Sequence, residues 1–305
     1  MSTHNTNPPE TRCGFIALVG APNVGKSTMV NAMIGQKVTI VSPKPQTTRA
    51  IMMGIKMAGP TQLIFVDTPG IFKPRQRLER AIVKEAWRGF YEVDYVALVV
   101  DGSKGICGGT RHVIEALQKE KRPACVIINK VDLIKASVLL PLSQELYDTK
   151  LFEQVFMVSA IHGDGVQDVV NFLSTKAPTG PWQYPENDFS SAPIQFLAAE
   201  MTREQIYLET EQELPYSTCI ETEEFEEKAD GSLLIRQVIY VLRDAQKKII
   251  IGKHGSKIKH ISETARKELE STLNRKVHLF LHVKVKDNWT ERPEHYDMMQ
   301  LDFPK

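Results

Sequence analysis

The sequence predicts an α/β domain with a doubly wound, mainly parallel sheet, followed by a smaller α+β domain. Three observations lead to this prediction. Short apolar runs alternate with helical patterns over roughly the first 175 residues, a proline-containing stretch then interrupts the pattern, and the order of helices and strands differs beyond it. A length of 305 residues also favours two domains, because a single core rarely grows so large.

Five apolar runs in the first part are rich in Val, Ile and Phe, as expected of strands that are buried on both faces. They cover Phe15–Val19, Gln62–Val66, Tyr95–Val100, Ala124–Ile128 and Gln154–Val158. Helical patterns lie between them, for example in Leu78–Phe90 and Val166–Leu173, so the sheet should be mainly parallel. Ile51–Met57 should add an edge strand that is antiparallel to Gln62–Val66.

The composition changes between Lys176 and Pro193, where four prolines and a glycine indicate a semi-rigid linker. The elements expected beyond it are a helix, two strands, two helices and a strand: Glu200–Glu213, Ser217–Glu226, Leu233–Leu242, Arg243–Lys248, Ser256–Leu273 and Val277–Val285. The predicted organisation is a flexible N-terminus over 1–12, a first domain over 13–178, a linker over 179–195, a second domain over 196–287 and a tail over 288–305. The tail carries Trp289, Tyr296 and Phe303, which are expected to pack on the second domain rather than to contact a ligand.

Bulk composition excludes several classes of protein. The four cysteines lack metal-ligand spacing and indicate a reducing compartment. The first ten residues do not resemble a signal peptide, and no apolar run reaches the eighteen or so residues that span a bilayer. We therefore expect a cytoplasmic protein, and a monomer, since no coiled-coil heptads are present.

Residues 20–27 match the phosphate-loop pattern G-x-x-x-x-G-K-[ST] directly after the first predicted strand. Backbone N–H groups of such a loop converge on phosphate oxygens, Lys26 can reach the β- and γ-phosphates, and Ser27 can ligate Mg²⁺. A chance match in a glycine turn is the alternative, and the strand and helix on either side argue against it. The residues predicted to contact the nucleotide here are Gly20, Ala21, Pro22, Asn23, Val24, Gly25, Lys26, Ser27 and Thr28.

The motif Asp67-Thr68-Pro69-Gly70 follows the strand Gln62–Val66. Asp67 can hold Mg²⁺ through a water molecule, and Gly70 lets the next loop approach the γ-phosphate, where its N–H can sense that group. A simple Asx-Pro-Gly turn would be the preferred interpretation if the phosphate loop were absent. All four residues, Asp67, Thr68, Pro69 and Gly70, are predicted to contact the nucleotide.

Two further strand ends predict recognition of guanine. After Ala124–Ile128, a buried Asp132 can accept both guanine N1–H and N2–H, whereas adenine lacks that donor pair. Asn129 can brace the loop, and the Lys130 stem can cover the base. After Gln154–Val158 come Ser159 and Ala160, and the Ala160 N–H can donate to guanine O6.

The segment Pro45-Gln46-Thr47-Thr48-Arg49 lies between the first helix and the second strand. A threonine there can close onto Mg²⁺ and the γ-phosphate; Thr48 is our choice and Thr47 the alternative, while a polar surface loop is the plain interpretation. The predicted catalytic residues are Lys26, Thr48 and Gly70, and the predicted Mg²⁺ ligands are Ser27, Thr48 and Asp67.

This ordered set of motifs resembles the translation-factor-like branch of P-loop GTPases and, within it, the TrmE–Era–EngA group. One position departs from Ras-type enzymes: Ile71 stands where a glutamine would orient water, so either intrinsic hydrolysis is slow or another group holds the water. The resemblance implies the class with a hydrophobic residue here, some of which use K⁺ held by a P-loop asparagine. Asn23 stands at the matching position, which makes K⁺ a candidate cofactor beside Mg²⁺.

The second domain contains G-x-x-G between two helical segments, at Gly252 to Gly255. Such a loop in KH domains brings backbone N–H groups against the phosphates of about four nucleotides. Charge supports this interpretation over an ordinary turn, because 243–286 carries 12 Lys+Arg and 4 Asp+Glu, whereas 200–230 carries 2 and 11. The predicted RNA-binding residues are Ile251, Gly252, Lys253, His254, Gly255, Lys257 and Lys259.

The element order around this loop resembles the type II KH fold, and the whole chain resembles the Era family of GTPases. That resemblance implies a switch that binds GTP and GDP, hydrolyses GTP, binds the 3′ end region of 16S rRNA and acts in assembly of the 30S ribosomal subunit. It also implies loose association with the inner membrane, for which the sequence shows no feature. Two rivals remain open: a regulatory GTPase whose second domain binds protein, and a nucleotide-binding scaffold without useful catalysis.

Overall fold

The computed structural model describes residues 10–304, and contacts between residues divide the chain into two compact units. The first unit contains the chain up to Val38, Ile51–Phe72 and Ala86–Ser191, and the second contains Thr39–Ala50, Lys73–Glu85 and the chain from Ala192 onward. Most of the predicted flexible N-terminus, residues 1–9, lies outside the described residues. Two short segments from the first half of the chain therefore belong to the second unit. Domain boundaries that divide the sequence into contiguous parts, as predicted, do not include such segments.

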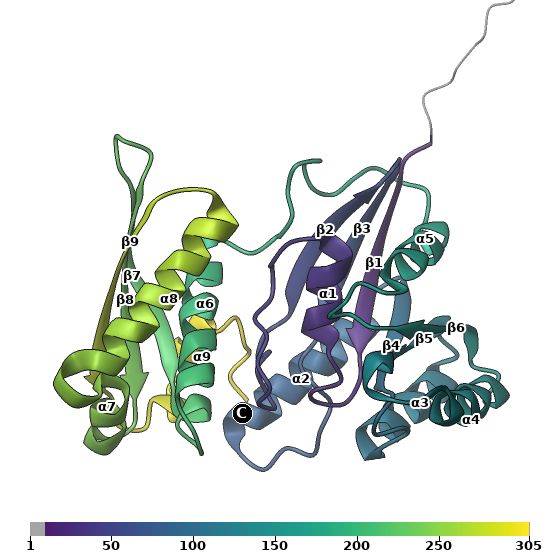
Figure 1. Cartoon of the computed structure of the whole chain (residues 1–305), viewed down its shortest axis with the longest axis horizontal. Coiled ribbons are helices and arrows are strands. Elements are labelled where there is room, and N and C mark those ends of the chain that lie inside the picture. Colours follow the sequence, from purple (N-terminus) through teal and green to yellow (C-terminus); the bar gives the residue numbers. More distant parts are fainter. Residues whose placement is uncertain (1–9, 305) are drawn as a thin grey trace, which may run out of the picture. The chain divides into compact units, whose positions relative to one another are not determined.

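A six-stranded sheet in the order β2-β3-β1-β4-β5-β6 forms the centre of the first unit (Figure 1). Its strands are β1 (Arg12–Val19), β2 (Met52–Ala58), β3 (Thr61–Asp67), β4 (Tyr95–Asp101), β5 (Ala124–Asn129) and β6 (Phe152–Val158). All neighbours are parallel except β2 and β3, which are antiparallel at the sheet edge, with Met52 opposite Asp67. The predicted doubly wound sheet and its antiparallel edge strand are confirmed.

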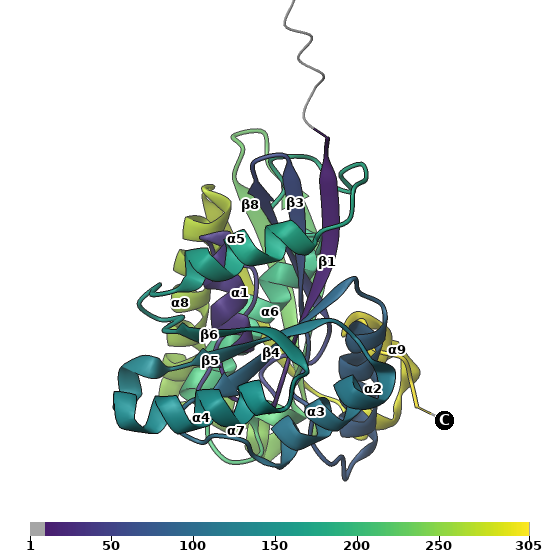
Figure 2. The ribbon, with the colours of Figure 1, turned by 90° about the vertical axis from the view of Figure 1, so that its right-hand side faces the viewer.

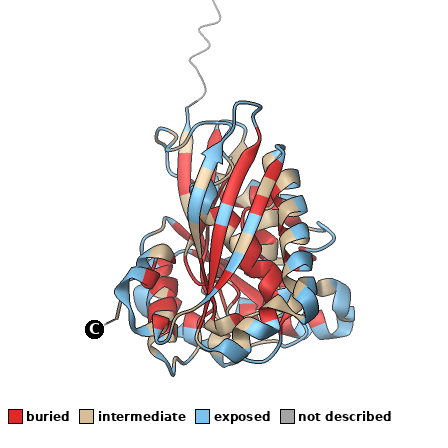
Figure 3. Cartoon of the chain, turned by 90° about the vertical axis from the view of Figure 1, so that its left-hand side faces the viewer, coloured by how far each residue is buried: buried red, intermediate tan, exposed pale blue. Residues whose placement is uncertain are grey.

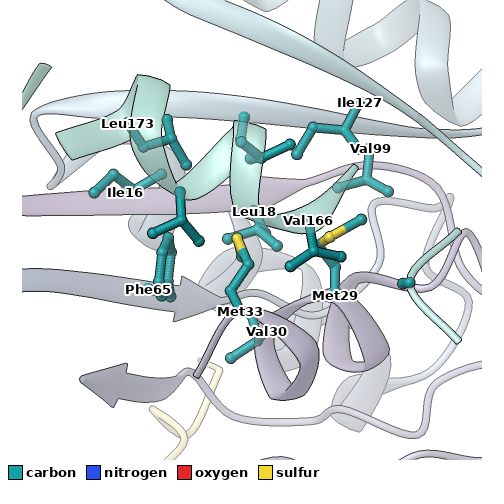
Figure 4. Packing of buried hydrophobic residues seen from close by; sticks show 14 of the residues in the cluster. Ile16, Leu18, Met29, Val30, Met33, Phe65, Val99, Ile127, Val166 and Leu173 are labelled. Atoms are coloured by element: carbon teal, nitrogen blue, oxygen red, sulfur yellow. The ribbon is translucent and has the colours of Figure 1, made fainter. Parts of the chain in front are cut away.

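Helices cover both faces of this sheet, as the rotated view in Figure 2 shows. They are α1 (Lys26–Ile34), α2 (Arg77–Tyr91), α3 (Gly108–Glu120), α4 (Ala136–Asp148) and α5 (Val166–Lys176), with a 3-10 turn η1 at Val131–Leu133. Alternate residues of β1 enter two different cores: Ile16 and Leu18 pack with α1 and α5, whereas Ala17 and Val19 face the core that includes α3 and α4. Figure 4 shows the first core closely. Burial of each large apolar side chain contributes about 1.5–3 kcal/mol.

The second unit contains a three-stranded sheet in the order β7-β8-β9, with the β7–β8 pair antiparallel and the β8–β9 pair parallel. Its elements are α6 (Ile194–Glu209), η2 (Pro215–Ser217), β7 (Cys219–Glu227), β8 (Leu233–Val241), α7 (Asp244–Ile251), η3 (Lys253–Gly255), α8 (Ser256–Leu273), β9 (Val277–Val285), η4 (Trp289–Glu291) and α9 (Pro293–Met298). Every residue of β8 except Arg236 is buried, whereas half-buried or exposed residues separate the buried Val277, Leu279 and Val283 of β9. Figure 3 shows the chain coloured by burial. The predicted order of helices and strands is confirmed.

The first helix of this unit differs from the prediction at both ends. It begins at Ile194, inside the predicted linker, because Pro193 supplies a fixed φ at the cap position. It ends at Glu209 rather than Glu213, and Gln212 has a left-handed φ of 56° that a continuing helix does not allow. The periodicity of residues 200–213 did not show this stop.

The proline-containing segment after α5 is held on the first unit by side-chain hydrogen bonds. Gln62 Oε1 accepts the Gln183 and Tyr184 N–H groups at 2.9 and 3.1 Å, and Trp182 Nε1 donates to the Pro60 backbone carbonyl at 3.0 Å. Gly54 and Ser190 also pair through their backbones in an isolated antiparallel β-bridge. These contacts order the segment.

The C-terminal tail packs within the second unit, as expected. Trp289 and Tyr296 are fully buried, and Trp289 Nε1 donates to the Ser217 carbonyl at 3.1 Å. The rings of Tyr296 and Phe303 meet edge to face with centroids 4.9 Å apart. Of the helices within residues 10–304, none combines the length and the apolar character required to cross a membrane.

Candidate functional site

The loop between β1 and α1 adopts the backbone conformation of a phosphate loop. Asn23 and Gly25 have positive φ angles of 63° and 95°, and α1 starts at Lys26. A Cβ atom on Gly25 would stand 2.4 Å from Asn129 Nδ2, so only glycine fits there. The loop therefore directs the N-terminus of α1 toward the site, as anion binding requires.

Lys26 is buried, and its ammonium donates to the carbonyls of Gly20 and Ala21 at 3.3 and 3.1 Å. Burial lowers its pKa to about 8, against the opposing effect of the Asp67 carboxylate. These carbonyls belong to the same loop, so the ammonium can exchange them for phosphate oxygens with little movement.

The Asp-Thr-Pro-Gly segment is tied to the phosphate loop at three points. Ser27 Oγ donates to Asp67 Oδ2 at 2.6 Å, and Asp67 is fully buried. The Ile71 N–H donates to the Gly20 carbonyl at 3.2 Å, and Gly70 lies against Pro22. The hydroxyl and carboxylate of Ser27 and Asp67 are hard oxygen donors within one hydrogen bond of each other, which fits a Mg²⁺ ion.

Thr68 has a structural contact, because its hydroxyl donates to the Leu18 carbonyl of β1 at 2.7 Å. The next residue, Pro69, lies in the same buried stretch. These two residues anchor the loop that presents Gly70.

Asn129 joins three loops of the first unit. Its Nδ2 donates to the Val24 carbonyl at 2.9 Å, and its Oδ1 accepts the Ala160 N–H at 3.1 Å. Lys130 Nζ donates to the Asn23 carbonyl at 2.7 Å, so it also holds the phosphate loop. The structure thus brings the phosphate loop and the two predicted guanine loops together.

Sequence reasoning missed Asp101, the last residue of β4. Its Oδ2 accepts Lys130 Nζ at 2.7 Å, and the Ser103 N–H and hydroxyl bind Oδ1. Burial opposes ionisation of this carboxyl, but the hydrogen bonds from Lys130 and Ser103 outweigh it and lower the pKa of Asp101. The sequence did offer a signal for Asp101, because it is an aspartate directly after a predicted strand, as Asp67 is.

Asp132 differs from the expectation in one respect: it is exposed rather than buried. Its Oδ1 accepts the Ser159 hydroxyl at 2.5 Å, which orients the carboxylate. The 3-10 turn η1 that contains Asp132 follows Lys130, whose φ of 64° turns the chain at the strand end.

Thr48 is assigned to a different unit from the residues of this cluster. It lies in Thr39–Ala50, which belongs to the second unit. The Thr47 hydroxyl is engaged within its own segment, where it contacts the Ser42 hydroxyl and donates to the Lys44 carbonyl at 2.8 Å.

The G-x-x-G loop connects α7 to α8 in the second unit. A Cβ atom on Gly252 would stand 2.7 Å from Lys257 Cβ and 3.0 Å from the Lys257 nitrogen, whereas a Cβ atom on Gly255 would point into open space. Both glycines and His254 have positive φ. Gly252 is thus required by packing, and Gly255 by its φ of 78° alone.

The predicted RNA-binding side chains fall into two groups. Lys253, His254 and Lys259 are exposed. Lys257 is half-buried and donates to the Glu209 carbonyl at 3.1 Å, and Ile251 packs against the core of the unit. The Glu209 carboxylate also lies 3.3 Å from His260 Nε2. His260 was not among the RNA-binding residues predicted from the sequence.

Comparisons with known proteins agree with this geometry. Residues 15–130 match the family described as 50S ribosome-binding GTPase, and residues 213–290 match the KH domain family. GTPase Era of Rhizobium meliloti strain 1021 is 51% identical over 295 residues, which cover 97% of this chain and 94% of that protein. GTPase Era of Brucella suis biovar 1 is 46% identical over 299 residues, covering 98% and 96%.

Two solved structures are similar over nearly the full chain. A crystal structure of Era in complex with MgGDPNP and nucleotides 1506–1542 of 16S ribosomal RNA has a TM-score of 0.89 at 35% identity, covering 95% of this chain and 98% of that one. A variant of Aquifex aeolicus Era bound to GDP and AlF4⁻ has a TM-score of 0.89 at 34% identity, covering 95% and 99%.

Proposed function

We propose, from the premise that this chain belongs to the Era family of GTPases, that it is a GTP-driven switch that binds the 3′ end region of 16S rRNA through its KH domain and acts in assembly of the 30S subunit. The observation that carries this proposal is that the phosphate loop contacts the Asp67 loop through Ser27 and the guanine loops through Asn129. One pocket then receives both ends of a guanosine triphosphate.

The phosphate end of that pocket uses Lys26 and Ser27. A triphosphate replaces the two carbonyls that Lys26 now contacts, and Mg²⁺ supplies charge neutralisation between the β- and γ-phosphates. Ser27 and Asp67 would hold the ion, Asp67 through a water molecule, and Thr48 would complete the set when its segment closes. The N–H of Gly70 would donate to the γ-phosphate and lose that partner on hydrolysis.

At the base end, Asp132 accepts guanine N1–H and N2–H while the Ala160 N–H donates to O6. Ser159 holds the Asp132 carboxylate in place from one side. The stem of Lys130, fixed at its ammonium by Asp101, covers one face of the base. An adenine would leave the carboxylate unpaired in a desolvated position, and such a mismatch lowers affinity strongly.

The side chain at position 71 cannot orient the attacking water, because Ile71 is apolar and buried. Hydrolysis should therefore be slow unless another group holds the water, and it depends more on charge neutralisation by cations. We infer that K⁺ supplies part of it and that Asn23, turned by its positive φ, contributes to its site. Equal turnover in sodium and potassium buffers would count against this role.

The KH domain supplies the RNA contact. Gly252 and Gly255 allow phosphates to approach the backbone of the loop, with Lys253 and His254 exposed at its tip. The RNA in the related structure, nucleotides 1506–1542, includes the region we propose for this chain. The protein would act as a monomer in the cytoplasm, with peripheral contact to the inner membrane as a further expectation.

The test combines two measurements on the full chain. Calorimetry should show GTP and GDP bound with Mg²⁺ and ATP excluded; equal affinity for ATP would overturn the nucleotide assignment. Crosslinking in cells, followed by sequencing of the attached RNA, should recover the 3′ end of 16S rRNA. Retained RNA affinity in the variant Lys253→Asp/His254→Asp would instead favour a second domain that binds protein, since two acids repel phosphate.

A further inference from the structure

A buried arginine holds the segment Thr39–Ala50 inside the second unit. Arg49 is 3% exposed. Its Nη1 donates to the Thr218 carbonyl at 2.7 Å, and its Nη2 donates to the carbonyls of Pro215 and Tyr216 at 3.0 and 2.9 Å. These acceptors are neutral and lie in and just after the 3-10 turn η2, where turn carbonyls lack intrahelical partners. The planar fork of a guanidinium can reach all three carbonyls at once.

The turn that Arg49 holds also contacts the helix that leads into the G-x-x-G loop. Gln246 Nε2 donates to the Ser217 hydroxyl at 2.8 Å, and Gln246 Oε1 accepts the N–H groups of Leu242 and Arg243 at 2.8 and 3.2 Å. Gln246 lies in the first turn of α7, which ends at Ile251 immediately before Gly252. One short turn therefore has Arg49 on one side and α7 on the other.

The surroundings of the turn leave it room to shift. A cavity of about 490 Å³ lies within the second unit, and its lining includes Gln46, Arg49, Glu79, Tyr216 and Gln246. Gln46 Nε2 also donates to Glu79 Oε1 at 3.1 Å, so the segments 39–50 and 73–85 meet beside the cavity. Packed side chains on all sides would fix the turn, whereas a cavity permits a second arrangement of these hydrogen bonds.

We propose that Arg49 is the positioning residue through which RNA on the G-x-x-G loop acts on Thr48. Arg49 directly follows Thr48, so any displacement of the turn at 215–218 moves the backbone of the proposed Mg²⁺ ligand. RNA that contacts Gly252 and Lys253 biases α7, and Gln246 transfers that bias to Ser217. The inference rests on the proposed function and adds the residues that carry the coupling.

The experiment measures reciprocal binding on the full chain with a 16S rRNA 3′-end oligonucleotide. RNA affinity is compared in the presence of GDP and of a non-hydrolysable GTP analogue, and the ratio is the coupling factor. A wild-type factor in the usual range of about 5- to 150-fold is expected. Arg49→Ala should bring the factor to about one while GDP affinity, and RNA affinity with GDP, stay at wild-type values, a separation that general destabilisation does not produce.

Two further variants sharpen the result. Arg49→Lys keeps the charge but replaces the fork by a point donor, so its coupling factor should also fall, and it decides the question if Arg49→Ala does not fold. Lys44→Ala is the matched control, because Lys44 Nζ donates to the carbonyls of Tyr207 and Thr210 from the same segment without contacting the turn. This control should keep the wild-type factor.

The outcomes distinguish a failure of the Arg49 inference from a failure of the proposed function on which it rests. A wild-type chain that binds neither GTP nor the RNA removes the proposed function and the inference with it. A wild-type factor of one, with both ligands bound, overturns the inference alone. An unchanged factor in both Arg49 variants, or an equal loss in Lys44→Ala, also overturns it.

Discussion

Gly70 lies so close to Pro22 that a Cβ atom on residue 70 would stand 2.8 Å from the Pro22 Cα atom. That contact joins the loop after β3 to the phosphate loop, beside the hydrogen bond from the Ile71 N–H to the Gly20 carbonyl. The obstacle is backbone, which cannot rotate away as a side chain could. The position of the Gly70 N–H therefore depends on the absence of a side chain.

Gly70→Ala should separate GDP binding from hydrolysis. The added methyl group must push the loop away from Pro22, so the Gly70 N–H loses its position at the γ-phosphate, and removal of one such donor lowers the rate about 10²-fold or more. GDP binding should stay near the wild-type value, because GDP has no γ-phosphate. Single-turnover phosphate release measures the first effect and calorimetry the second.

The control for this prediction is Gly108→Ala at the start of α3, where a Cβ atom would meet nothing within 4 Å. Its phosphate release should match the wild-type rate. A wild-type rate in Gly70→Ala would show that the loop does not act through its contact with Pro22.

Asp132→Asn should exchange guanine for xanthine specificity. The amide keeps the size of the carboxylate but places a donor where guanine presents its own donors, so GTP affinity should fall by about 10⁴-fold. Xanthosine triphosphate offers a carbonyl at that position and should bind the variant more tightly than GTP does. Competition of both nucleotides against fluorescent GDP measures the exchange.

The matched control is Asp164→Asn, an exposed aspartate in the loop that follows β6. It removes the same charge near Ser159 without touching the proposed base site. Equal losses of GTP affinity in the two variants would mean that Asp132 acts only through the local electrostatic potential.

Nucleotide binding should take up a proton at alkaline pH because of Lys26. Burial lowers its pKa to about 8 in the free protein, and phosphates raise it again toward the ordinary value. Well below pH 8 the ammonium is charged before and after binding, so almost no proton moves. Above pH 8 the free protein carries the neutral amine, and binding of GDP should take up close to one proton by pH 9.

Calorimetry of GDP binding in buffers with different ionisation enthalpies measures this uptake directly. Titrations at pH 6.5 provide the internal control, where the heat should not depend on the buffer through this group. A buffer-independent heat at pH 9 would show that Lys26 stays charged in the free protein.

The fold was largely accessible from the sequence because strands buried on both faces are continuous apolar runs. β1, β3, β4 and β5 contain the predicted runs Phe15–Val19, Gln62–Val66, Tyr95–Val100 and Ala124–Ile128. The end of α6 was not accessible, since the left-handed φ of Gln212 is not revealed by residue type, whereas Pro193 was a signal for the start of the helix that periodicity does not use. Periodicity locates an element better than its caps do.

The residues of the site could be predicted from sequence motifs, but the hydrogen bonds that join them could not. Lys26, Ser27, Asp67, Asn129 and Asp132 follow from spacing and from their places at strand ends. Asp101 and the multiple contacts of Asn129 do not, because they depend on which strands are neighbours in the sheet. The role of Arg49 in the second unit was also hidden, since its acceptors are backbone carbonyls about 170 residues away and carry no residue signature.

The tail of the second unit should lose stability in mild acid because of His295. This side chain is fully buried between the rings of Tyr240 and Trp289, with centroids 5.1 and 5.8 Å away, and neither ring nitrogen has a hydrogen-bond partner within the described residues. Burial lowers its pKa, with Lys286 adding to the effect and Glu294 and Glu221 opposing it.

The direction of the pH effect follows from this lowered pKa. Above about pH 6.5, the ordinary value for histidine, the imidazole is neutral in the folded and unfolded chain. As the pH falls through that value, His295 binds a proton in the unfolded chain but stays neutral in the folded chain, so the free energy of unfolding decreases. His295→Phe keeps an aromatic ring without a titrating group, and should lose less stability between pH 7.5 and 5.5 than the wild type does.

The measurement is urea unfolding followed by Trp289 fluorescence, in a chain whose other two tryptophans, Trp87 and Trp182, are replaced by Phe. This probe reports on the tail itself, because Trp289 is fully buried there and donates to Ser217. His162→Phe, at an exposed histidine of the first unit, serves as the control and should keep the wild-type pH dependence. If His295→Phe and the wild type lose equal stability over this range, protonation of the tail histidine is not what weakens the packing.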